Sequence, residues 1–316
     1  MPRSSTCGSR TPCRAPEGAN SALDTTRLVF LAVLVLLNIA FVFGWVWAVR
    51  RHRLTGRPTI GDVLIGVGTD FLDTLGIGSF APSTALFKFR GRPADELIPG
   101  TLNVGHNVAA FLETLLFVTA VTVDPMLLAC TVASAALGAW LGAGVVSRLP
   151  RRTIQIFMGI ALLIAAAFFL VRIFDKLPAG GTEFALHGWR FAVAVAVNFV
   201  LGALMCIGIG NYAPSMIIFA LLGMHPLAAF PIMMGSDGLV QPVASLGFFR
   251  SGRFSHPTAL GIAMGGVVGV LVAFYIVKQL PLTLMRWLIV VVVTYAAVSL
   301  LRSARAAARD GVPASQ

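Results

Sequence analysis

The sequence predicts an all-α polytopic membrane protein made of two inverted repeats. Each repeat is expected to be a re-entrant broken-helix hairpin plus three transmembrane helices, and an extra N-terminal transmembrane helix precedes them. Hydrophobic residues make up 57% of the 316 residues and charged residues only 12%, whereas a soluble domain carries about 25% charged residues. Apolar runs of membrane-crossing length, about 20 residues, recur along the chain. One eight-residue phrase is written twice, as GIGSFAPS at 76–83 and as GIGNYAPS at 208–215.

The chain divides at changes of composition. Full membrane crossings are expected at 99–122, 126–147, 154–172, 231–249, 258–277 and 282–301, separated by basic clusters and by proline-containing turns. The expected segments are a disordered polar tail at 1–27, an extra transmembrane helix at 28–49, repeat 1 at 59–172, repeat 2 at 189–301 and a basic cytoplasmic tail at 302–316.

Two apolar regions, 59–89 and 189–222, do not fit a simple crossing. Each is too long for one membrane helix and too short for two, since a crossing takes about 20 residues. Each contains the repeated phrase, whose glycines interrupt a helix. We therefore expect each region to enter the membrane, turn and leave on the same side.

The residues after the glycines predict the start of a second, shorter helix. Ser79 and Asn211 occupy the same slot, and both are favoured N-cap residues. Pro82 and Pro214 follow in the first turn, where a missing N–H costs nothing. The sequence alone also allows that these residues only cap and turn the chain.

The distribution of positive charge predicts the orientation in the membrane. Lys and Arg form five short clusters between apolar runs, and all five lie on the cytoplasmic side if the two hairpins do not cross. The C-terminus is then cytoplasmic, the N-terminal tail lies outside, and an odd number of crossings inverts the second repeat. This placement explains the net charge of +11, so the expected partner is the lipid bilayer and not a nucleic acid.

Two short helices that start near the membrane midplane would direct free N–H groups and positive dipole ends at one point, which predicts an anion site. The candidate substrate-binding residues are Gly76, Gly78, Ser79, Ser83, Asn103, Gly208, Gly210, Asn211 and Ser215.

Ionisable residues at membrane depth are costly and are usually functional. The sequence contains no recognisable nucleotide-binding segment that could supply energy, so a proton gradient is the simplest driver of transport. The candidates for carrying the proton at membrane depth are Asp73, His106 and Asp237. Asp70 and Glu113 are expected at a similar depth, and for these two residues a functional role and a packing role are about equally expected. The alternative for the whole group is internal pairing, such as Asp73 with His106, that packs the bundle.

Enzymatic activity is not expected, because the sequence suggests no nucleophile–base pair. Metal-ligand spacing is absent, and GIG lacks the Lys-Ser/Thr ending of a phosphate-binding loop. No cofactor or metal ion is therefore expected. A homo-oligomer remains open.

The phrase GIG, a proline-containing half-helix, a short loop and IPGTLN at 98–103 together resemble the sulfite exporter TauE/SafE family of membrane permeases. The resemblance covers about 59–301. Family members usually have more glycine after GIG, whereas this chain has Ser79-Phe80 and Asn211-Tyr212.

The resemblance implies a secondary transporter of the cell membrane that exports sulfite or a related sulfur-containing anion, such as an organosulfonate. The alternative is a cation- or proton-coupled importer of another small solute, in which the membrane-embedded Asp residues coordinate the cation.

Overall fold

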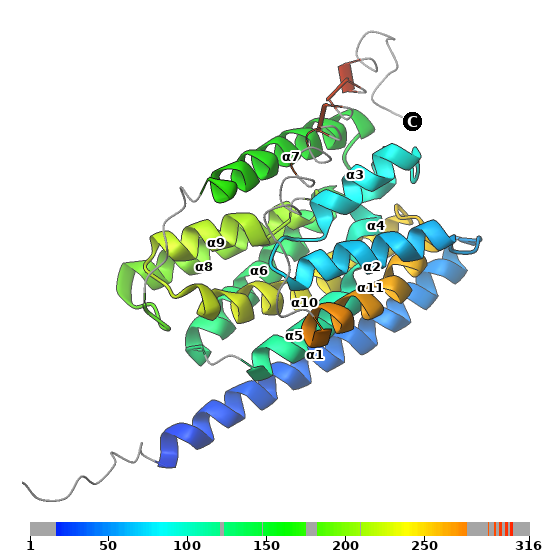
Figure 1. Cartoon of the computed structure of the whole chain (residues 1–316). Helices are drawn as coiled ribbons and strands as arrows, with labels where there is room; N and C mark the ends of the chain where they lie inside the picture. The colour runs from blue at the N-terminus through cyan, green and yellow to red at the C-terminus, as the bar shows by residue number, and fades with distance from the viewer. Residues whose placement is uncertain are drawn as a thin grey trace, which may run out of the picture.

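The computed structural model describes residues 17–120, 123–146, 148–174, 182–208 and 210–276, with isolated positions between 290 and 305. Within these residues the secondary structure is helical, apart from one isolated β-bridge between Glu183 and Met224 (Figure 1). The elements are α1 (Glu17–Arg51), α2 (Ile60–Thr74), α3 (Phe80–Arg90), η1 (Asp95–Leu97), α4 (Ile98–Gly105), α5 (Asn107–Ala120), α6 (Pro125–Val146), α7 (Arg151–Ile173), α8 (Gly188–Met205), α9 (Tyr212–Leu221), α10 (Pro226–Ser251) and α11 (His256–Ile276).

Four of the described helices are long and apolar enough to cross a membrane, which indicates a membrane protein. They contain the segments Leu28–Arg51, Pro125–Val146, Gly188–Met205 and His256–Tyr275. Three of these confirm expected helices. The fourth, α8, lies in the region that was expected to form only a hairpin arm, and its 18 residues give it a length of about 27 Å at 1.5 Å per residue.

Some boundaries differ from the sequence-based expectation. Helix α1 begins at Glu17, so the polar segment expected to be disordered up to residue 27 is helical from residue 17. The expected crossing 99–122 is divided at His106 into α4 and α5. The expected crossing 282–301 lies almost entirely outside the described residues.

The repeated phrase interrupts the helices where the sequence predicts. Residues 75–79 separate α2 from α3, and residues 206–211 separate α8 from α9. Gly76, Gly78 and Gly208 have φ values of 76°, 96° and 95°, a region that side-chain-bearing residues rarely adopt. The backbone turn therefore requires glycine at these three positions.

The N-terminal end of α2 is fixed by a capping box. Thr59 accepts a hydrogen bond from the backbone N–H of Asp62, and Asp62 accepts one from the backbone N–H of Thr59. Arg90, at the end of α3, contacts the Asp62 carboxylate at 2.7 Å. Burial alone would raise the pKa of Asp62, but the Thr59 hydrogen bonds and the Arg90 charge lower it below its ordinary value. The two arms of the first broken helix are thus joined at their open end.

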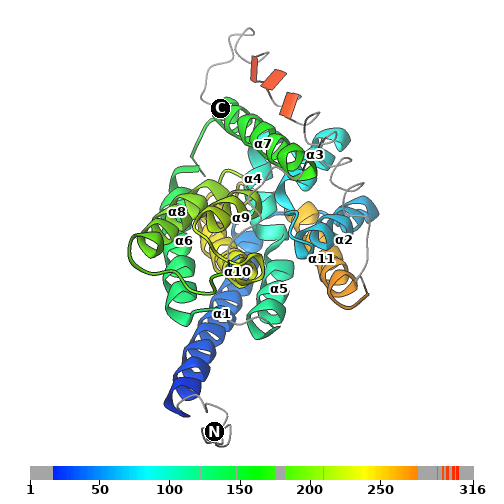
Figure 2. The ribbon, with the colours of Figure 1, turned by 60° about the vertical axis from the view of Figure 1, so that its left-hand side comes forward.

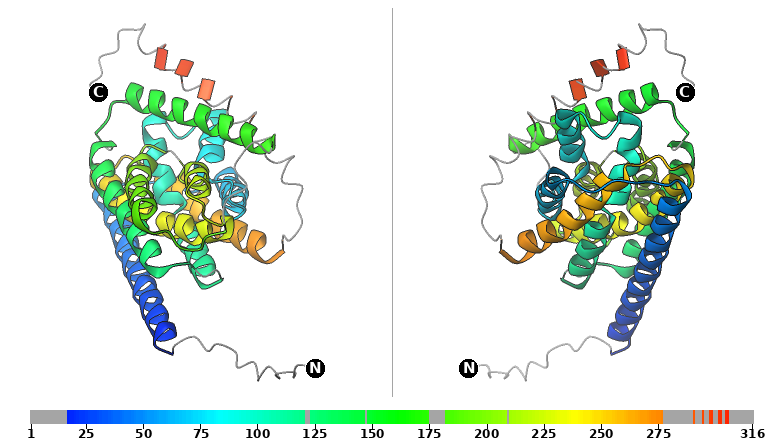
Figure 3. Two further views of the ribbon diagram at one scale, coloured as in Figure 1. Left: turned by 90° about the vertical axis from the view of Figure 1, so that its left-hand side faces the viewer. Right: turned by 90° about the vertical axis from the view of Figure 1, so that its right-hand side faces the viewer.

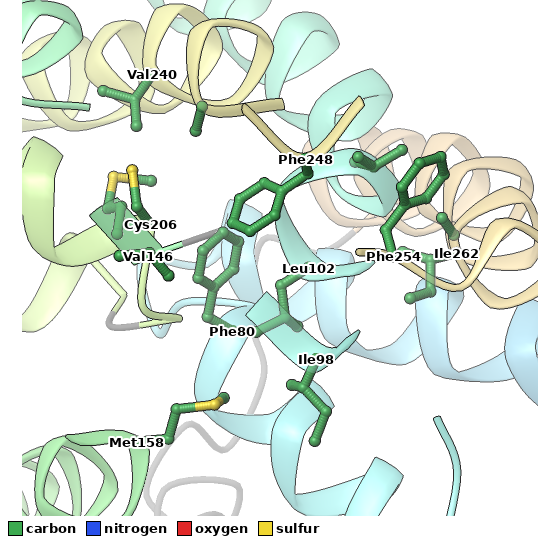
Figure 4. Close-up of a cluster of buried hydrophobic side chains, with 14 of the residues drawn as sticks. Phe80, Ile98, Leu102, Val146, Met158, Cys206, Val240, Phe248, Phe254 and Ile262 are labelled. Atoms are coloured by element: carbon green, nitrogen blue, oxygen red, sulfur yellow. The ribbon is translucent and has the colours of Figure 1, made fainter. Parts of the chain in front are cut away.

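Helix packing in the bundle is reciprocal. Helix α2 packs along α11, and α8 packs along α6. Helix α10 lies in the middle of the bundle against α5, α6 and α1 (Figure 2). Helices α1 and α7 lie on opposite sides of the bundle (Figure 3). An apolar cluster that includes Phe80, Leu102 and Phe248 fills the space beside the first broken helix (Figure 4).

Close packing of α2 on α11 predicts a strong effect of one methyl group. A β-carbon at Gly66 would overlap the backbone of Ile262, whereas one at Gly68, two residues along the same helix, would meet nothing within 4 Å. We expect Gly66→Ala to lower stability by about 1–3 kcal/mol through overpacking. Gly68→Ala should be neutral or stabilising by up to about 1 kcal/mol through helix propensity. Thermal unfolding of the two purified variants checks this, and equal stability would contradict the packing.

Candidate functional site

The two copies of the repeated phrase face each other. A β-carbon at Gly78 would lie 3.8 Å from Cβ of Tyr212, and one at Gly210 would lie 3.9 Å from Cβ of Phe80. Each copy therefore presents its second glycine to the aromatic residue of the other copy. This brings the starts of α3 and α9 together, as the sequence predicts for the two half-helices.

The expectation that Ser79 and Asn211 cap these helices through their side chains is wrong. Both residues have helical backbone angles, and neither side chain bonds to the backbone of its own helix. Instead, Ser79 Oγ donates to Asp73 Oδ2 at 3.1 Å, and Asn211 Nδ2 donates to Asp237 Oδ1 at 3.2 Å. As N-caps these side chains would accept from a backbone N–H, whereas here each donates to a carboxylate oxygen, which is a strong acceptor.

One turn into each half-helix, a serine extends the network. Ser83 Oγ lies 2.9 Å from Nε2 of His106, and Nδ1 of His106 lies 2.6 Å from Oδ1 of Asp70. In the second copy, Ser215 Oγ donates to Oδ1 of Asn211 at 2.5 Å. The partner of His106 is thus Asp70, and not Asp73 as the packing alternative supposed.

The order serine, histidine, aspartate at these distances is that of a nucleophile–base–acid triad, which the sequence did not suggest. Ser83, His106 and Asp70 have no exposed surface. Complete burial suits a hydrogen-bonded array that holds and passes a proton better than one that attacks a substrate.

Glu113 and Tyr212 complete the site between the two broken helices. Thr74 Oγ1 donates to Oε1 of Glu113 at 2.6 Å, and the Tyr212 hydroxyl lies 3.4 Å from Oε2. The Tyr212 hydroxyl also contacts Sδ of Met234 at 2.6 Å. Tyr212 was not among the residues predicted from the sequence, although the exchange of Phe80 for tyrosine in the second copy of the phrase was the available signal.

Four carboxyl groups and one imidazole are buried together here. The exposed fractions are 0% for Asp70, 1% for Asp73, 0% for Glu113, 3% for Asp237 and 0% for His106. In the part of the chain that the structure describes, the hydrogen-bond and ion-pair partners of these five side chains include no lysine or arginine. Several carboxylates buried this close cannot all be charged without a large cost, so the site is suited to binding protons or a cation.

Asn103 differs from its expected role. Its Nδ2 donates to the backbone carbonyl oxygens of Pro99, at 2.9 Å, and Met205, at 3.3 Å. The atom of its side chain without a partner is the carbonyl oxygen Oδ1. In this arrangement Asn103 offers an acceptor, which an anionic substrate cannot use.

Comparison with known proteins gives no relative from which a role could be transferred: no protein-family model matches the chain, and no similar curated protein or solved structure was found.

Proposed function

We propose that the protein is a secondary transporter of the cell membrane that carries a small anion, either sulfite or a related sulfur-containing anion, in a proton-coupled cycle. The observation that carries the proposal is the meeting of two broken helices whose first residues, Ser79 and Asn211, each hold a buried carboxylate. Broken helices that meet between repeats are the usual binding site of secondary transporters. The choice of a sulfur anion and of export rests on the resemblance to the TauE/SafE family.

We propose that the two repeats are inverted and that each broken helix forms a re-entrant hairpin, and the packing of the helices supports the inverted arrangement. The offset of 132 residues between Gly76 and Gly208 relates α2 to α8 and α6 to α11. The contact of α2 with α11 is then the counterpart of the contact of α8 with α6. Such exchanged contacts, together with the facing of Gly78 to Tyr212 and Gly210 to Phe80, are what a pseudo-two-fold axis between two repeats produces.

The resident carboxylates suggest how proton and anion are linked. Asp73 and Asp237 take the hydrogen bonds that a substrate anion would need from Ser79 and Asn211. Protonation removes their negative charge and frees these donors and the positive ends of α3 and α9 for the anion. The anion and the proton therefore bind together, and net flow follows the sum of their two gradients.

A second candidate function is a cation-coupled importer. The density of buried acids favours it, because Asp70, Asp73, Glu113 and Asp237 could hold a cation with no anion present. In that case removal of the acids would abolish substrate binding and not only the coupling.

The proposal is tested by flux into proteoliposomes that contain the purified protein. Sulfite, sulfate, thiosulfate and a set of organosulfonates are compared, each with and without a pH gradient, against protein-free liposomes. We expect saturable flux of at least one sulfur-containing anion that is accelerated by the gradient. Flux of cations or neutral solutes alone would favour the importer.

The hairpin topology gives a separate prediction. In a variant without its native cysteines, a cysteine at Arg92 and one at Arg250 should both resist an impermeant thiol reagent in intact cells, because the basic clusters lie in the cytoplasm. A cysteine at the exposed residue Glu183 serves as the external control and should be labelled. Labelling of either basic-cluster position from outside would contradict the re-entrant hairpins.

A further inference from the structure

Three buried amide side chains, on α4, α5 and α10, are used by no step of the proposed transport. Asn103, Asn107 and Gln241 each have no exposed surface. The carbonyl oxygens of all three, and also Nε2 of Gln241, have no hydrogen-bond partner. Buried polar groups are nearly always paired, so three such residues in one region require an explanation.

Two contacts fix how the helices face each other. Near one end, a β-carbon at Gly100 would overlap the carbonyl oxygen of Arg253 and would lie 2.9 Å from Cδ1 of Phe248. Near the other end, Thr114 Oγ1 donates to the carbonyl oxygen of Met234 at 2.7 Å. The helices are therefore antiparallel. Because His106 N bonds to Leu102 O, and Ala110 N to His106 O, the helical phase continues from α4 into α5.

These contacts place Asn107 opposite residues 241–246 of α10, the stretch that begins with Gln241. Asn107 lies seven residues from both Gly100 and Thr114, and Gln241 lies seven residues from both Met234 and Phe248. Two turns of helix return a side chain to nearly the same face, so both residues lie on the facing sides. Asn103 lies one turn before Asn107 on the same side.

The hydrogen bonds of Asn103 and Asn107 show which atoms of their side chains are left without a partner. Asn103 uses its NH2 group on the carbonyl oxygens of Pro99 and Met205. Asn107 uses its NH2 group on Oδ1 of Asn38, 2.8 Å away, and the Asn38 NH2 group is itself bound to Leu34 O. The remaining atom of each is an oxygen that can only accept or coordinate.

From these observations we infer that the seam between α4–α5 and α10 holds a monovalent cation of sodium size, coordinated by the side-chain carbonyl oxygens of Asn103, Asn107 and Gln241. Carbonyl oxygens replace the hydration shell of such ions at membrane depth. Asp237 lies one turn before Gln241 on the same side of α10. An anion is excluded because the asparagine oxygens would repel it.

The test is the melting temperature of the purified protein in detergent, with choline chloride replaced stepwise by NaCl at constant ionic strength. We expect a saturable rise of roughly 2–5 °C over a hundredfold range of sodium concentration. The rise should disappear in Gln241→Met, which keeps the size of the side chain and removes its oxygen. That variant should also melt higher than wild type in choline chloride, since an unpaired buried amide has been removed.

Two further variants make the result specific. Asn198 on α8 is also a buried asparagine with an unpaired Oδ1, and Asn198→Leu should keep the sodium effect. Gln241→Glu keeps an oxygen at the same place and should keep or increase the sodium effect, which covers the case in which Gln241→Met does not fold. A wild-type protein without a sodium-specific shift, or a shift that survives in Gln241→Met, would overturn the inference and leave water as the occupant. Because no transported anion is present, the outcome does not depend on the proposed function.

Discussion

Asp73→Asn is expected to abolish accumulation driven by a pH gradient while substrate exchange continues. The asparagine carries no negative charge, so it leaves the Ser79 hydroxyl, which lies 3.1 Å from the carboxylate in the wild type, free for the anion, but it cannot gain or lose a proton. It therefore resembles the protonated acid, the form that the proposal assigns to the anion-bound state. A gradient of one pH unit stores about 1.4 kcal/mol per proton, enough for about tenfold accumulation, and the variant should lose this factor entirely.

The measurement is counterflow and gradient-driven uptake on the same reconstituted variant. Asp124→Asn is the matched control, because Asp124 caps α6 through a 2.7 Å bond to the backbone N–H of Leu127 and asparagine caps equally well. It should behave as wild type. If Asp73→Asn retains both activities, Asp73 does not couple the proton. If both activities vanish in a folded variant, Asp73 belongs to the binding site and the cation-coupled importer becomes the better account.

Removal of the two polar groups at the helix starts should weaken substrate binding. Ser79→Ala and Asn211→Leu each delete a donor that the proposal assigns to the anion, and both positions are nearly completely buried. A hydrogen bond to a charged group contributes about 1.5–3 kcal/mol, so each variant should raise the apparent KM by about 10- to 100-fold. The concentration dependence of flux in proteoliposomes gives this value.

Two substitutions of the same kinds serve as controls outside the site. Ser134→Ala and Asn198→Leu remove polar groups that bond to backbone carbonyl oxygens of α8, and neither should change the apparent KM. An unchanged KM in both Ser79→Ala and Asn211→Leu would mean that these residues serve only the structure of the turn.

The sequence predicted the helix interruptions well because they depend on local chemistry. Gly76, Gly78 and Gly208 adopt backbone angles that only glycine takes readily, and a duplicated phrase makes that signal hard to miss. The division between α4 and α5 at His106 was not predicted, and the His106 side chain contacts Ser83 and Asp70 on two other helices. Such contacts are tertiary and leave no periodic pattern in the sequence.

The burial of Asp73, His106 and Asp237 was predicted better than the hydrogen bonds that these residues make. Burial of polar residues at membrane depth follows from composition, so Asp73, His106 and Asp237 could be selected. Their partners could not, because Ser79 was expected to bond to its own helix and instead bonds to Asp73. An N-cap accepts a hydrogen bond from a backbone N–H, whereas the Ser79 hydroxyl donates one to a carboxylate, and only the folded geometry decides which partner is within reach.

Cotransport of anion and proton can be measured as the proton flux that accompanies a flux of the anion. The proteoliposomes contain a pH indicator, and their membrane potential is clamped. Among the sulfur-containing anions that the protein transports, the one with the strongest conjugate acid is supplied as a gradient, so that the anion itself carries no proton. The account predicts proton movement in the direction of the anion, absent from Asp73→Asn and from protein-free liposomes. Anion flux at the wild-type rate without any proton movement would contradict it.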